Sequence, residues 1–232
     1  MRMIELEKKL GDFHLQIRDL YLAPGWIHGL IGPNGCGKTT LCRLLAGTLI
    51  ADAGSIDYEG LKPRDITMTA QKPYMLHDSV YKNLVYPLRL RGIRPDETRV
   101  EQWLARCGLA DKRKQSARSL SSGEQQKLSF ARALIFDPKL VIVDETLSNL
   151  DPDSARLFES WMLERQATEP ITWILISHQL PHLLRVCDEV HFLEKGRHLA
   201  SGTAEQMLLH PTVDAVRRFV AEQSVQSDGK HV

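Results

Sequence analysis

The start of the chain has the alternating apolar and polar pattern of β-strands, followed by a mostly apolar run over residues 26–31. Successive side chains of a strand point to opposite faces, so the alternation predicts strands with one buried face. The continuous run predicts a strand that is buried on both faces. We therefore expect antiparallel strands that lead into a buried strand; the alternating apolar positions are Ile4, Leu6, Leu15 and Ile17.

Beyond this region, apolar residues recur three and four positions apart, which is typical of the buried face of a helix. This spacing predicts helices over residues 38–49 and 124–136, and a third whose stripe includes Phe158, Trp161, Met162 and Arg165. Short apolar runs predict strands over residues 140–143, 172–176 and 190–193. Another helix begins at the capping-box pattern of residues 203–206. Alternating strands and helices predict an α/β fold with a mainly parallel sheet covered on both faces.

Residues 78–123 are helical in pattern, charged and rich in arginine, with a break at residues 92–96. We interpret them as a helical subdomain inserted into a single domain that spans residues 1–232. The core then consists of residues 1–77 and 124–220. The polar residues 221–232 are predicted to form a flexible tail.

The composition is that of an ordinary globular domain, with 43% hydrophobic and 25% charged residues. Thirty Lys and Arg residues nearly balance 29 Asp and Glu residues, so no global positive field favours nucleic acid as a partner. No apolar run approaches the roughly 18 residues of a membrane-spanning helix. The polar start and four cysteines without CxxC spacing predict a cytoplasmic protein with reduced thiols and no secretory signal. If the protein serves a membrane, it docks from one side.

A glycine-rich segment lies between the predicted buried strand and the first helix. It matches G-x-x-x-x-G-K-[ST], a loop whose backbone N–H groups bind the phosphates of a nucleotide with help from the helix N-terminus. A chance glycine-rich turn would not need a strand before it and a helix after it. The segment predicts an ATP site made of Gly32, Pro33, Asn34, Gly35, Cys36, Gly37, Lys38, Thr39 and Thr40.

Side chains within this loop have separate expected roles. Lys38 supplies a mobile positive charge, the Thr39 hydroxyl is the expected Mg²⁺ ligand, and Thr40 supports the α-phosphate. Cys36 has two readings. It is either simply a small loop residue or, because the nearby helix N-terminus lowers the pKa of a thiol, it is sensitive to alkylation without being catalytic.

Two carboxylates follow the predicted strand at residues 140–143. Asp144 is expected to hold Mg²⁺ through water, and Glu145 to orient and polarise the attacking water. An Asp-Glu pair is common at the end of a strand, so the pair indicates hydrolysis machinery only because a phosphate loop lies upstream. His178 follows the next strand, where its imidazole can reach the γ-phosphate and Glu145. His182 has the i, i+4 spacing of a metal pair with His178, but Pro181 and the change from strand to helix argue against that reading.

Residues 120–126, Leu-Ser-Ser-Gly-Glu-Gln-Gln, resemble the LSGGQ signature of ABC (ATP-binding cassette) ATPases. The resemblance covers almost the whole chain and keeps the family's motif order: phosphate loop, Gln71 as Q-loop glutamine, signature, Asp144 and Glu145, the D-loop Ser148-Asn149-Leu150-Asp151, and His178 as switch histidine. It implies a P-loop NTPase (RecA-like) core with an antiparallel β subdomain and the inserted helical subdomain.

The same resemblance implies how ATP is held and hydrolysed. Two subunits, as a homodimer, sandwich each ATP, with Ser121 and Gly123 of one chain completing the site of the other. Gln71 is implied both in catalysis and as a Mg²⁺ ligand that reports nucleotide state to the helical subdomain. Asp151 joins the nucleotide site, and an aromatic ring stacks on adenine, for which the chain offers Phe13 or Tyr21; Phe13 is the candidate.

Some positions depart from the family pattern. Ser122 stands where glycine is common, Glu124 replaces the signature glutamine, and Thr146 replaces the proline that often follows the catalytic glutamate. A side chain at Ser122 is expected to crowd the approach of the second subunit's phosphates.

Residues 71–76 and 80–88 are similar to bacterial importer ATPases, which favours uptake over export and, more weakly, an oxyanion such as tungstate or molybdate. The implied partners are transmembrane permease subunits and a solute-binding protein. The apolar residues Met75, Leu76 and Tyr86 are either core residues or a docking patch for the permease. The place of action is then the cytoplasmic face of the membrane.

A second reading is a soluble ABC ATPase that acts on nucleic acid, ribosomes or complex assembly. Such proteins usually carry two cassettes, basic arms or long coiled coils, and the sequence shows none of these. A P-loop kinase or a catalytically silent nucleotide-binding module conflicts with the signature and with Glu145.

Overall fold

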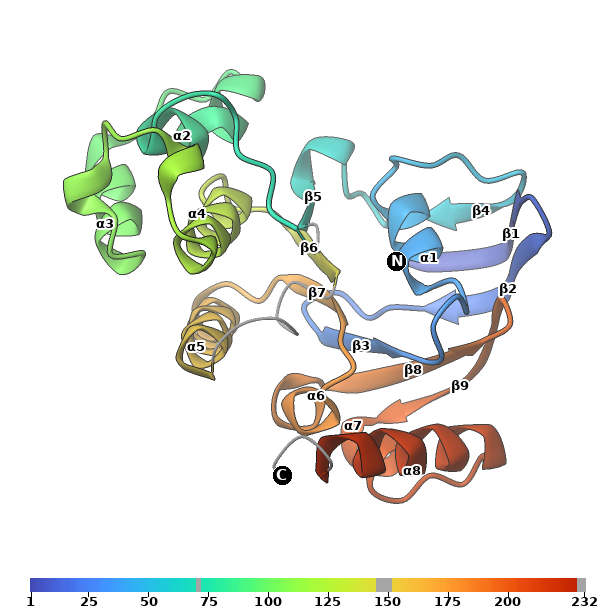
Figure 1. Cartoon of the computed structure of the whole chain (residues 1–232). Helices are drawn as coiled ribbons and strands as arrows, with labels where there is room; N and C mark the ends of the chain where they lie inside the picture. Colours follow the sequence, from blue (N-terminus) through green and yellow to red (C-terminus); the bar gives the residue numbers. More distant parts are fainter. Residues whose placement is uncertain (70–71, 145–151, 229–232) are drawn as a thin grey trace.

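The computed structural model describes residues 1–69, 72–144 and 152–228 and contains one large sheet (Figure 1). The strands are β1 (Arg2–Leu10), β2 (Phe13–Tyr21), β3 (Ile27–Ile31), β4 (Ala53–Asp57), β5 (Ile66–Thr69), β6 (Leu140–Asp144), β7 (Thr172–Ile176), β8 (Glu189–Glu194) and β9 (Arg197–Thr203). Their order across the sheet is β4-β1-β2-β9-β8-β3-β7-β6-β5.

The sheet has a parallel part and an antiparallel part. Strands β8, β3, β7, β6 and β5 are mutually parallel neighbours, whereas β1 pairs antiparallel with both β2 and β4. Strand β9 joins the two parts, because it pairs antiparallel with β8 and parallel with β2. The predicted α/β class, with an antiparallel β subdomain beside a parallel core, is confirmed.

The described helices fall into two groups. Figure 1 shows α2, α3 and α4 in a lobe of their own, while the other helices lie against the sheet. None of the described helices has the length and apolar content to cross a bilayer. The α-helices are α1 (Lys38–Leu45), α2 (Val80–Leu90), α3 (Glu97–Arg106), α4 (Ser122–Leu134), α5 (Pro152–Thr168), α6 (Leu180–Val186), α7 (Ala204–Leu208) and α8 (Asp214–Asp228), with short 3₁₀ segments at Pro63–Asp65, Ala110–Lys112 and Ala117–Ser119.

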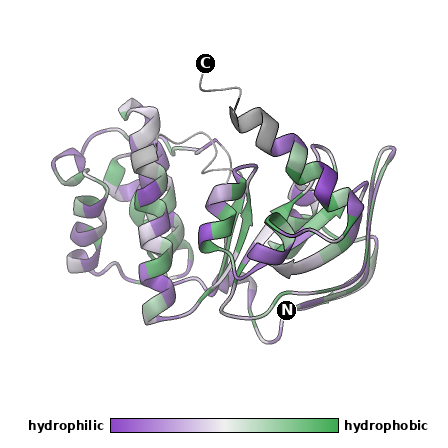
Figure 2. Cartoon of the chain, turned by 90° about the horizontal axis from the view of Figure 1, so that it is seen from below, coloured by the Kyte–Doolittle hydropathy of each residue, from purple (hydrophilic) through white to green (hydrophobic). Residues whose placement is uncertain are grey.

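The parallel strands are buried on both faces. Along β6, Leu140 and Ile142 pack into the cluster that contains α1, whereas Val141 and Val143 pack into the cluster that contains α5 and the helical lobe. Figure 2 shows this apolar sheet enclosed by helices whose outer residues are more hydrophilic. Double burial explains why these strands read as continuous apolar runs in the sequence.

Aromatic rings join the helical lobe to the sheet. The ring of Phe130 in α4 lies 4.4 Å from that of Phe158 in α5 and 6.2 Å from that of Trp173 in β7, measured between centroids. Trp103 of α3 meets Trp161 of α5 edge to face at 5.4 Å. Such pairs add about 0.5–1.5 kcal/mol each beyond their buried area, so this cluster is a strong part of the connection.

Several element ends differ from the sequence prediction, two of them by four residues or more. Helix α1 stops at Leu45 rather than at residue 49, because Gly47 adopts a left-handed φ of 68° and ends the helix. Helix α8 continues to Asp228, so residues 221–228 are helical where a flexible tail is predicted. Phe219 anchors this helix against Phe192 of β8, with ring centroids 5.6 Å apart.

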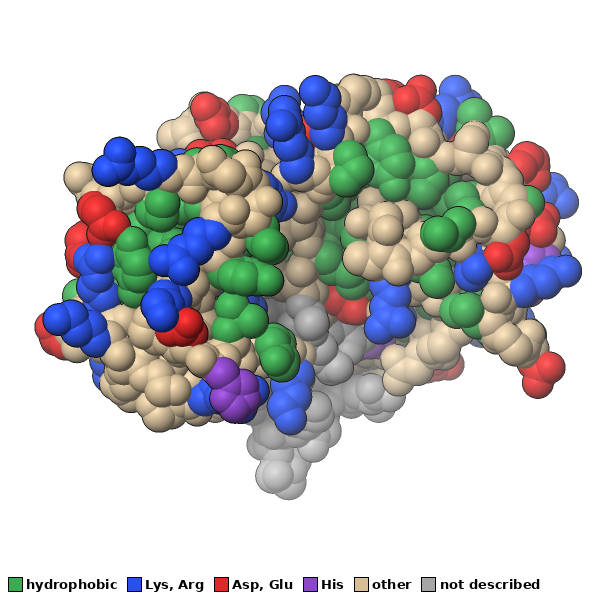
Figure 3. All heavy atoms as spheres, turned by 90° about the horizontal axis from the view of Figure 1, so that it is seen from above, with side chains coloured by type: hydrophobic (Ala, Val, Ile, Leu, Met, Phe, Trp, Pro, Cys, Tyr) green, Lys and Arg blue, Asp and Glu red, His purple; other side chains and the backbone are tan. Residues whose placement is uncertain are grey.

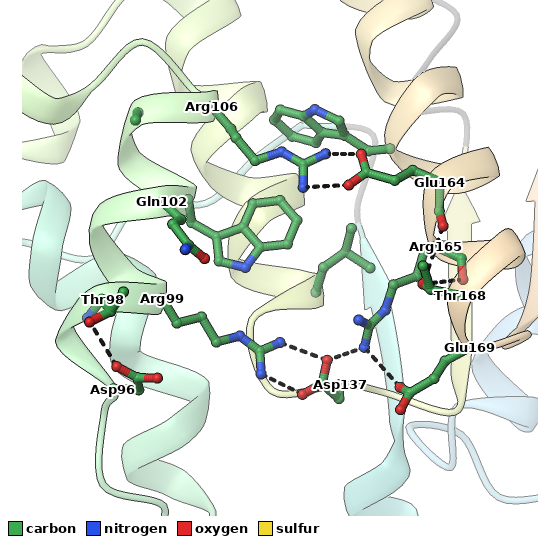
Figure 4. Close-up of a pocket in the computed structure, with 14 residues that line it drawn as sticks. Asp96, Thr98, Arg99, Gln102, Arg106, Asp137, Glu164, Arg165, Thr168 and Glu169 are labelled. Carbon is green, nitrogen blue, oxygen red and sulfur yellow. Dashed lines mark hydrogen bonds and ion pairs between the residues drawn. The ribbon is translucent and has the colours of Figure 1, made fainter.

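Charged groups line a pocket of about 970 Å³ between α3 and α5 (Figure 4). Asp137 lies in the loop after α4 and accepts hydrogen bonds from Arg99 of α3 and Arg165 of α5. Burial acts to raise the pKa of the Asp137 carboxyl, but the two guanidinium groups outweigh it and lower the pKa. Asp137 therefore ties the helical lobe to the core through charge.

Replacing Asp137 with Asn tests this connection. Asn tolerates the left-handed φ of 54° at this position, so the substitution removes mainly the charge. We expect Asp137→Asn to lower the free energy of unfolding by about 1 kcal/mol at pH 7, because the side chain is partly exposed. The folded-state pKa lies below the unfolded value of about 3.9, so the stabilisation is complete above that pH and is lost as the pH falls through the folded-state pKa.

Urea titrations of wild type and variant between pH 7 and pH 3 measure this difference. The exposed Asp214, which pairs with Arg217, provides the control Asp214→Asn, expected to change stability by less than about 0.5 kcal/mol. A Asp137→Asn deficit that stays constant down to pH 3 would contradict the assigned role.

Candidate functional site

The predicted phosphate loop follows β3, and the backbone geometry explains why two of its residues are glycines. A Cβ at Gly32 would lie 2.0 Å from the Leu193 carbonyl oxygen, and Gly32 has a φ of 142°. Gly37 caps α1 with a φ of 110°, and a Cβ there would lie 2.8 Å from the ring of Phe13. Only glycine fits both positions, so the backbone of the loop can curl around an anion at the N-terminus of α1.

Lys38 is buried and bends back over the loop. Its Nζ donates to the carbonyl oxygens of Gly32 at 2.7 Å and Pro33 at 3.1 Å. Among the described residues, no carboxylate lies within ion-pair distance of this ammonium. The loop therefore presents a positive charge that suits the binding of phosphate.

Thr39 and Asp144 come together from distant parts of the sequence. The Thr39 Oγ1, in the first turn of α1, donates to the Asp144 Oδ1 at 3.3 Å, at the end of β6. A hydroxyl and a carboxylate are the oxygen ligands that Mg²⁺ prefers. The donor set present here therefore fits the ion expected from the sequence.

His178 follows β7, the strand that lies between β3 and β6 in the sheet. In β7, Ile176 pairs with Leu30 of β3 and with Asp144 of β6. The carboxyl ends of these three parallel strands therefore lie side by side, and His178, half-buried, follows the middle one. This arrangement puts the histidine between the phosphate loop and the carboxylate, where ligands bind in open α/β sheets.

Other predicted site residues fall outside the described residues. Gln71 follows β5, the neighbour of β6, and Glu145 follows Asp144 directly. Asp151 directly precedes α5 in the sequence. The roles of Gln71, Glu145 and Asp151 stay predictions.

Ser121 and Gly123 lie at the N-terminus of α4 and form a regular helix cap. The Ser121 Oγ accepts from the Glu124 N–H at 3.3 Å, and the Ser121 N–H donates to Glu124 Oε2 at 2.9 Å. Lys112 pairs with the same carboxylate, and its hydrogen bond, followed by that of Ser121, lowers the pKa of Glu124. Glu124 thus closes the cap in the position where the family has glutamine, and Ser122 is exposed in the first turn.

The structure does not bring this helix end to the phosphate loop of the same chain. Figure 1 places α4 in the helical lobe and α1 against the sheet. A Cβ added at Gly123 meets no atom of the described residues within 4 Å, so the cap opens to space that this part of the chain does not fill.

Phe13 begins β2 and packs against the loop at Gly37, whereas the alternative ring, Tyr21, ends the same strand and is exposed. Of the two aromatic candidates, only Phe13 is therefore next to the phosphate loop.

The expectation that Cys36 is sensitive to alkylation is wrong. Its side chain is buried, with 3% exposed, and burial raises the pKa of its thiol against the opposing influence of Lys38. The Cys36 carbonyl oxygen accepts the Gly196 N–H at 3.0 Å, so the turn between β8 and β9 covers this part of the loop. Sequence reasoning missed this support, because it joins segments 160 residues apart and the only local signal is the Lys195-Gly196 turn.

Comparison with known proteins is consistent with this geometry. Residues 15–148 match the ABC transporter family. The chain is 35% identical over 193 residues to the tungstate uptake system ATP-binding protein TupC of Peptoclostridium acidaminophilum, covering 81% of this chain and 90% of that protein. It is 32% identical to the methionine import ATP-binding protein MetN 1 of Listeria monocytogenes serotype 4b, covering 96% of this chain and 72% of that protein. It is 33% identical to the Fe(3+) ions import ATP-binding protein FbpC 1 of Haemophilus influenzae, covering 91% of this chain and 67% of that protein.

Solved structures agree on the fold. An ATP-binding subunit of an ABC transporter superimposes with a TM-score of 0.84 at 22% identity, covering 96% of this chain and 98% of that one. The ADP conformation of an ATP-binding cassette superimposes with a TM-score of 0.74 at 26% identity, covering 94% and 97%. The chain therefore belongs to the ABC transporter family, as an ATP-binding domain of the kind that hydrolyses ATP to power transport.

Proposed function

We propose that this chain drives solute uptake by closing with a second copy of itself around two ATP molecules. The observation that carries the proposal is the separation of two half-sites within one chain. The phosphate loop lies on the sheet, and the capped N-terminus of α4 opens to space from the helical lobe. A second copy in the opposite orientation supplies the missing helix end, whose partial positive charge attracts the γ-phosphate.

Each side chain of the site has a defined task in hydrolysis. Lys38 exchanges its bonds to the Gly32 and Pro33 carbonyls for the β- and γ-phosphates. Thr39 and Asp144 hold Mg²⁺, which when bound neutralises charge that develops on the phosphates. Glu145 orients the water that attacks the γ-phosphorus, and His178 hydrogen-bonds the departing phosphate. The products are ADP and inorganic phosphate.

The membrane partner docks on the helical lobe. Tyr74 and Leu90 are about two-thirds exposed and Tyr86 is 40% exposed, and Figure 3 shows hydrophobic side chains at the surface of this lobe. Met75, which was also considered for docking, is buried and therefore belongs to the core. Exposed aromatic residues beside the segment of Gln71 suit a helix from a permease subunit. The chain then works on the cytoplasmic face of the membrane.

Uptake is favoured because the named relatives are import proteins for tungstate, methionine and iron. These solutes share no chemistry, so the specificity for a solute belongs to the permease and to a solute-binding protein. An oxyanion of the tungstate type is the proposed solute class, on the strength of the similarity to TupC over most of both chains.

Thr39→Val tests the magnesium ligand. The substitution removes the hydroxyl at nearly the same volume, so ATP binding in EDTA should stay within about twofold of wild type. ATP hydrolysis with Mg²⁺ should fall roughly 100-fold, because a first ligand is lost. The matched control is Thr48→Val, whose hydroxyl is exposed and bonds only the Arg43 carbonyl. A Thr39→Val enzyme that hydrolyses Mg-ATP at the wild-type rate would remove Thr39 from the site.

Phe13→Ala tests adenine stacking. Loss of a stacked ring costs about 1–3 kcal/mol, so ATP affinity should fall roughly 10-fold or more. Affinity for inorganic tripolyphosphate, which has no base, should not change, and competition with a fluorescent nucleotide measures both. Tyr21→Ala, at the other end of β2, serves as the control. Equal losses for ATP and tripolyphosphate would show that Phe13 supports the loop rather than the base.

Glu145→Gln tests the sandwich. Without its carboxylate the site should hydrolyse ATP about 10²- to 10⁴-fold more slowly, so ATP persists and the closed dimer accumulates. Size-exclusion chromatography with light scattering should show dimers in saturating Mg-ATP and monomers without nucleotide. Adding Gly123→Asp to the Glu145→Gln protein places a negative charge next to the phosphates of the ATP bound by the second subunit. This double variant should be monomeric. A monomeric Glu145→Gln protein in saturating Mg-ATP would overturn the two-subunit mechanism.

A further inference from the structure

A second group of chemically reactive side chains lies away from the phosphate loop. It consists of His28 on β3 with Glu189 and His191 on β8. The two strands pair in parallel, with His28 opposite Glu189 and Leu30 opposite His191. Residues two apart on a strand share a face, so the register directs all three side chains to the same side of the sheet. The group lies toward the starts of both strands, whereas the phosphate loop follows the end of β3.

The three side chains converge on one point. His28 Nδ1 lies 3.1 Å from His191 Nε2, and each of these nitrogens lies 3.5 Å from Glu189 Oε2. Ligands held tetrahedrally about 2.0–2.1 Å from a zinc ion are about 3.3–3.4 Å apart, so the observed triangle has the size of one face of such a tetrahedron. We propose that His28, Glu189 and His191 bind a divalent transition-metal cation, of which Zn²⁺ is the best match.

The hydrogen bonds of the cluster favour a cation at its centre. The Ala23 carbonyl lies 3.0 Å from His28 Nε2 and only accepts, so that nitrogen carries the proton and Nδ1 presents a lone pair. Glu189, when ionised, presents lone pairs as well. A backbone carbonyl that fixes the tautomer of a ligating histidine is the usual outer support of a metal site.

The second ring nitrogen of His191, Nδ1, faces away from the cluster. This nitrogen is buried and has no hydrogen-bond partner among the described residues, and the same holds for Nε2 of the neighbouring His198. The two rings have centroids 5.6 Å apart. Coordination through Nε2 would place the His191 proton on Nδ1, and a rotation of the His191 or His198 ring would be needed for His198 Nε2 to accept it.

Burial suits the cluster to a transition metal. The His28 and His191 side chains are fully buried, and desolvation lowers the pKa of both imidazoles, so both are neutral and able to coordinate. Desolvation raises the pKa of Glu189, a cost that a bound cation offsets. The Glu189 side chain keeps 23% of its surface exposed, so solvent reaches the edge of the cluster. Imidazole ligands exclude Mg²⁺ and Ca²⁺ as the preferred ions, since both favour oxygen.

Calorimetric titration of metal-free, nucleotide-free protein with Zn²⁺ tests the proposal. We expect one Zn²⁺ per chain, and visible absorption bands typical of tetrahedral coordination when Co²⁺ is used instead. Glu189→Gln keeps the size of a partly exposed side chain and should weaken Zn²⁺ binding by about 10-fold or more. His191→Gln should abolish both the binding and the cobalt bands.

Two further variants separate this site from other metal-binding groups. Asp144→Asn removes a ligand of the nucleotide-site metal, and His210→Gln removes an exposed histidine outside the cluster. Both should bind one Zn²⁺ with wild-type affinity. Thermal melting in EDTA shows whether each variant is folded. If His191→Gln is not folded, the Zn²⁺ affinity of Glu189→Gln decides whether the cluster binds the cation.

The proposal fails if wild-type protein binds less than one Zn²⁺ per chain at micromolar concentration. It also fails if folded Glu189→Gln binds Zn²⁺ as tightly as wild type, or if Asp144→Asn abolishes binding. In those cases the two histidines are a buried hydrogen-bonded pair. None of these results depends on dimer closure or transport, so the proposal and the proposed function are tested separately.

Discussion

The parallel pairing of β3, β7 and β6 is the constraint on which the nucleotide site depends. Ile176 pairs with Leu30 on one side and with Asp144 on the other, so the three strands end side by side and the loops that follow them begin at the same edge of the sheet. Burial on both faces maintains this register. A slip of one residue would turn Trp173 from the side of α5 toward α1, where the fully buried residues are aliphatic or sulfur-containing and already closely packed. Packing thus positions chemistry that none of the individual loops could position alone.

The helical lobe is held to this sheet by a different kind of contact. Aromatic packing between Phe130, Phe158 and Trp173 fills the interior, and charged groups around Asp137 close the surface. Packing of this kind resists separation, whereas partly exposed ion pairs rearrange at small cost. The lobe is thus attached by two kinds of contact, a buried aromatic cluster and partly exposed ion pairs.

Local patterns in the sequence were enough for most elements and for the phosphate loop. The run Thr172–Ile176 is a strand with the predicted limits, and Thr203 caps α7 with Gln206 as the pattern predicts. Both results follow from signals contained within a few residues. The pairing of Thr39 with Asp144 also follows from local signals, because parallel strands bring their carboxyl ends to one edge of the sheet.

Features that depend on distant segments could not be predicted in this way. Cys36 lies near a helix N-terminus, which lowers a thiol pKa, but the distant β8–β9 turn bonds its carbonyl, its side chain is buried, and desolvation raises the pKa. Helix α8 extends into the predicted tail as far as Asp228, and it is anchored before the tail begins, where Phe219 packs against Phe192 on the sheet. His28 and His191 are 163 residues apart, and nothing in either neighbourhood indicates that β3 and β8 will be neighbours. Gln71, Glu145 and Asp151 lie outside the described residues, so their assignment still rests on sequence.

Strands β3 and β8 connect the proposed cation site to the nucleotide site. Beyond His28, β3 runs into Gly32, and beyond His191, β8 runs into the turn at Gly196 that bonds the Cys36 carbonyl. A cation that ties these strands together at one end limits their relative sliding at the other. Because the register between them is already fixed by four residue pairs, the ion has no second arrangement to select. Its effect should therefore be to stabilise the support of the phosphate loop, without switching the loop between states.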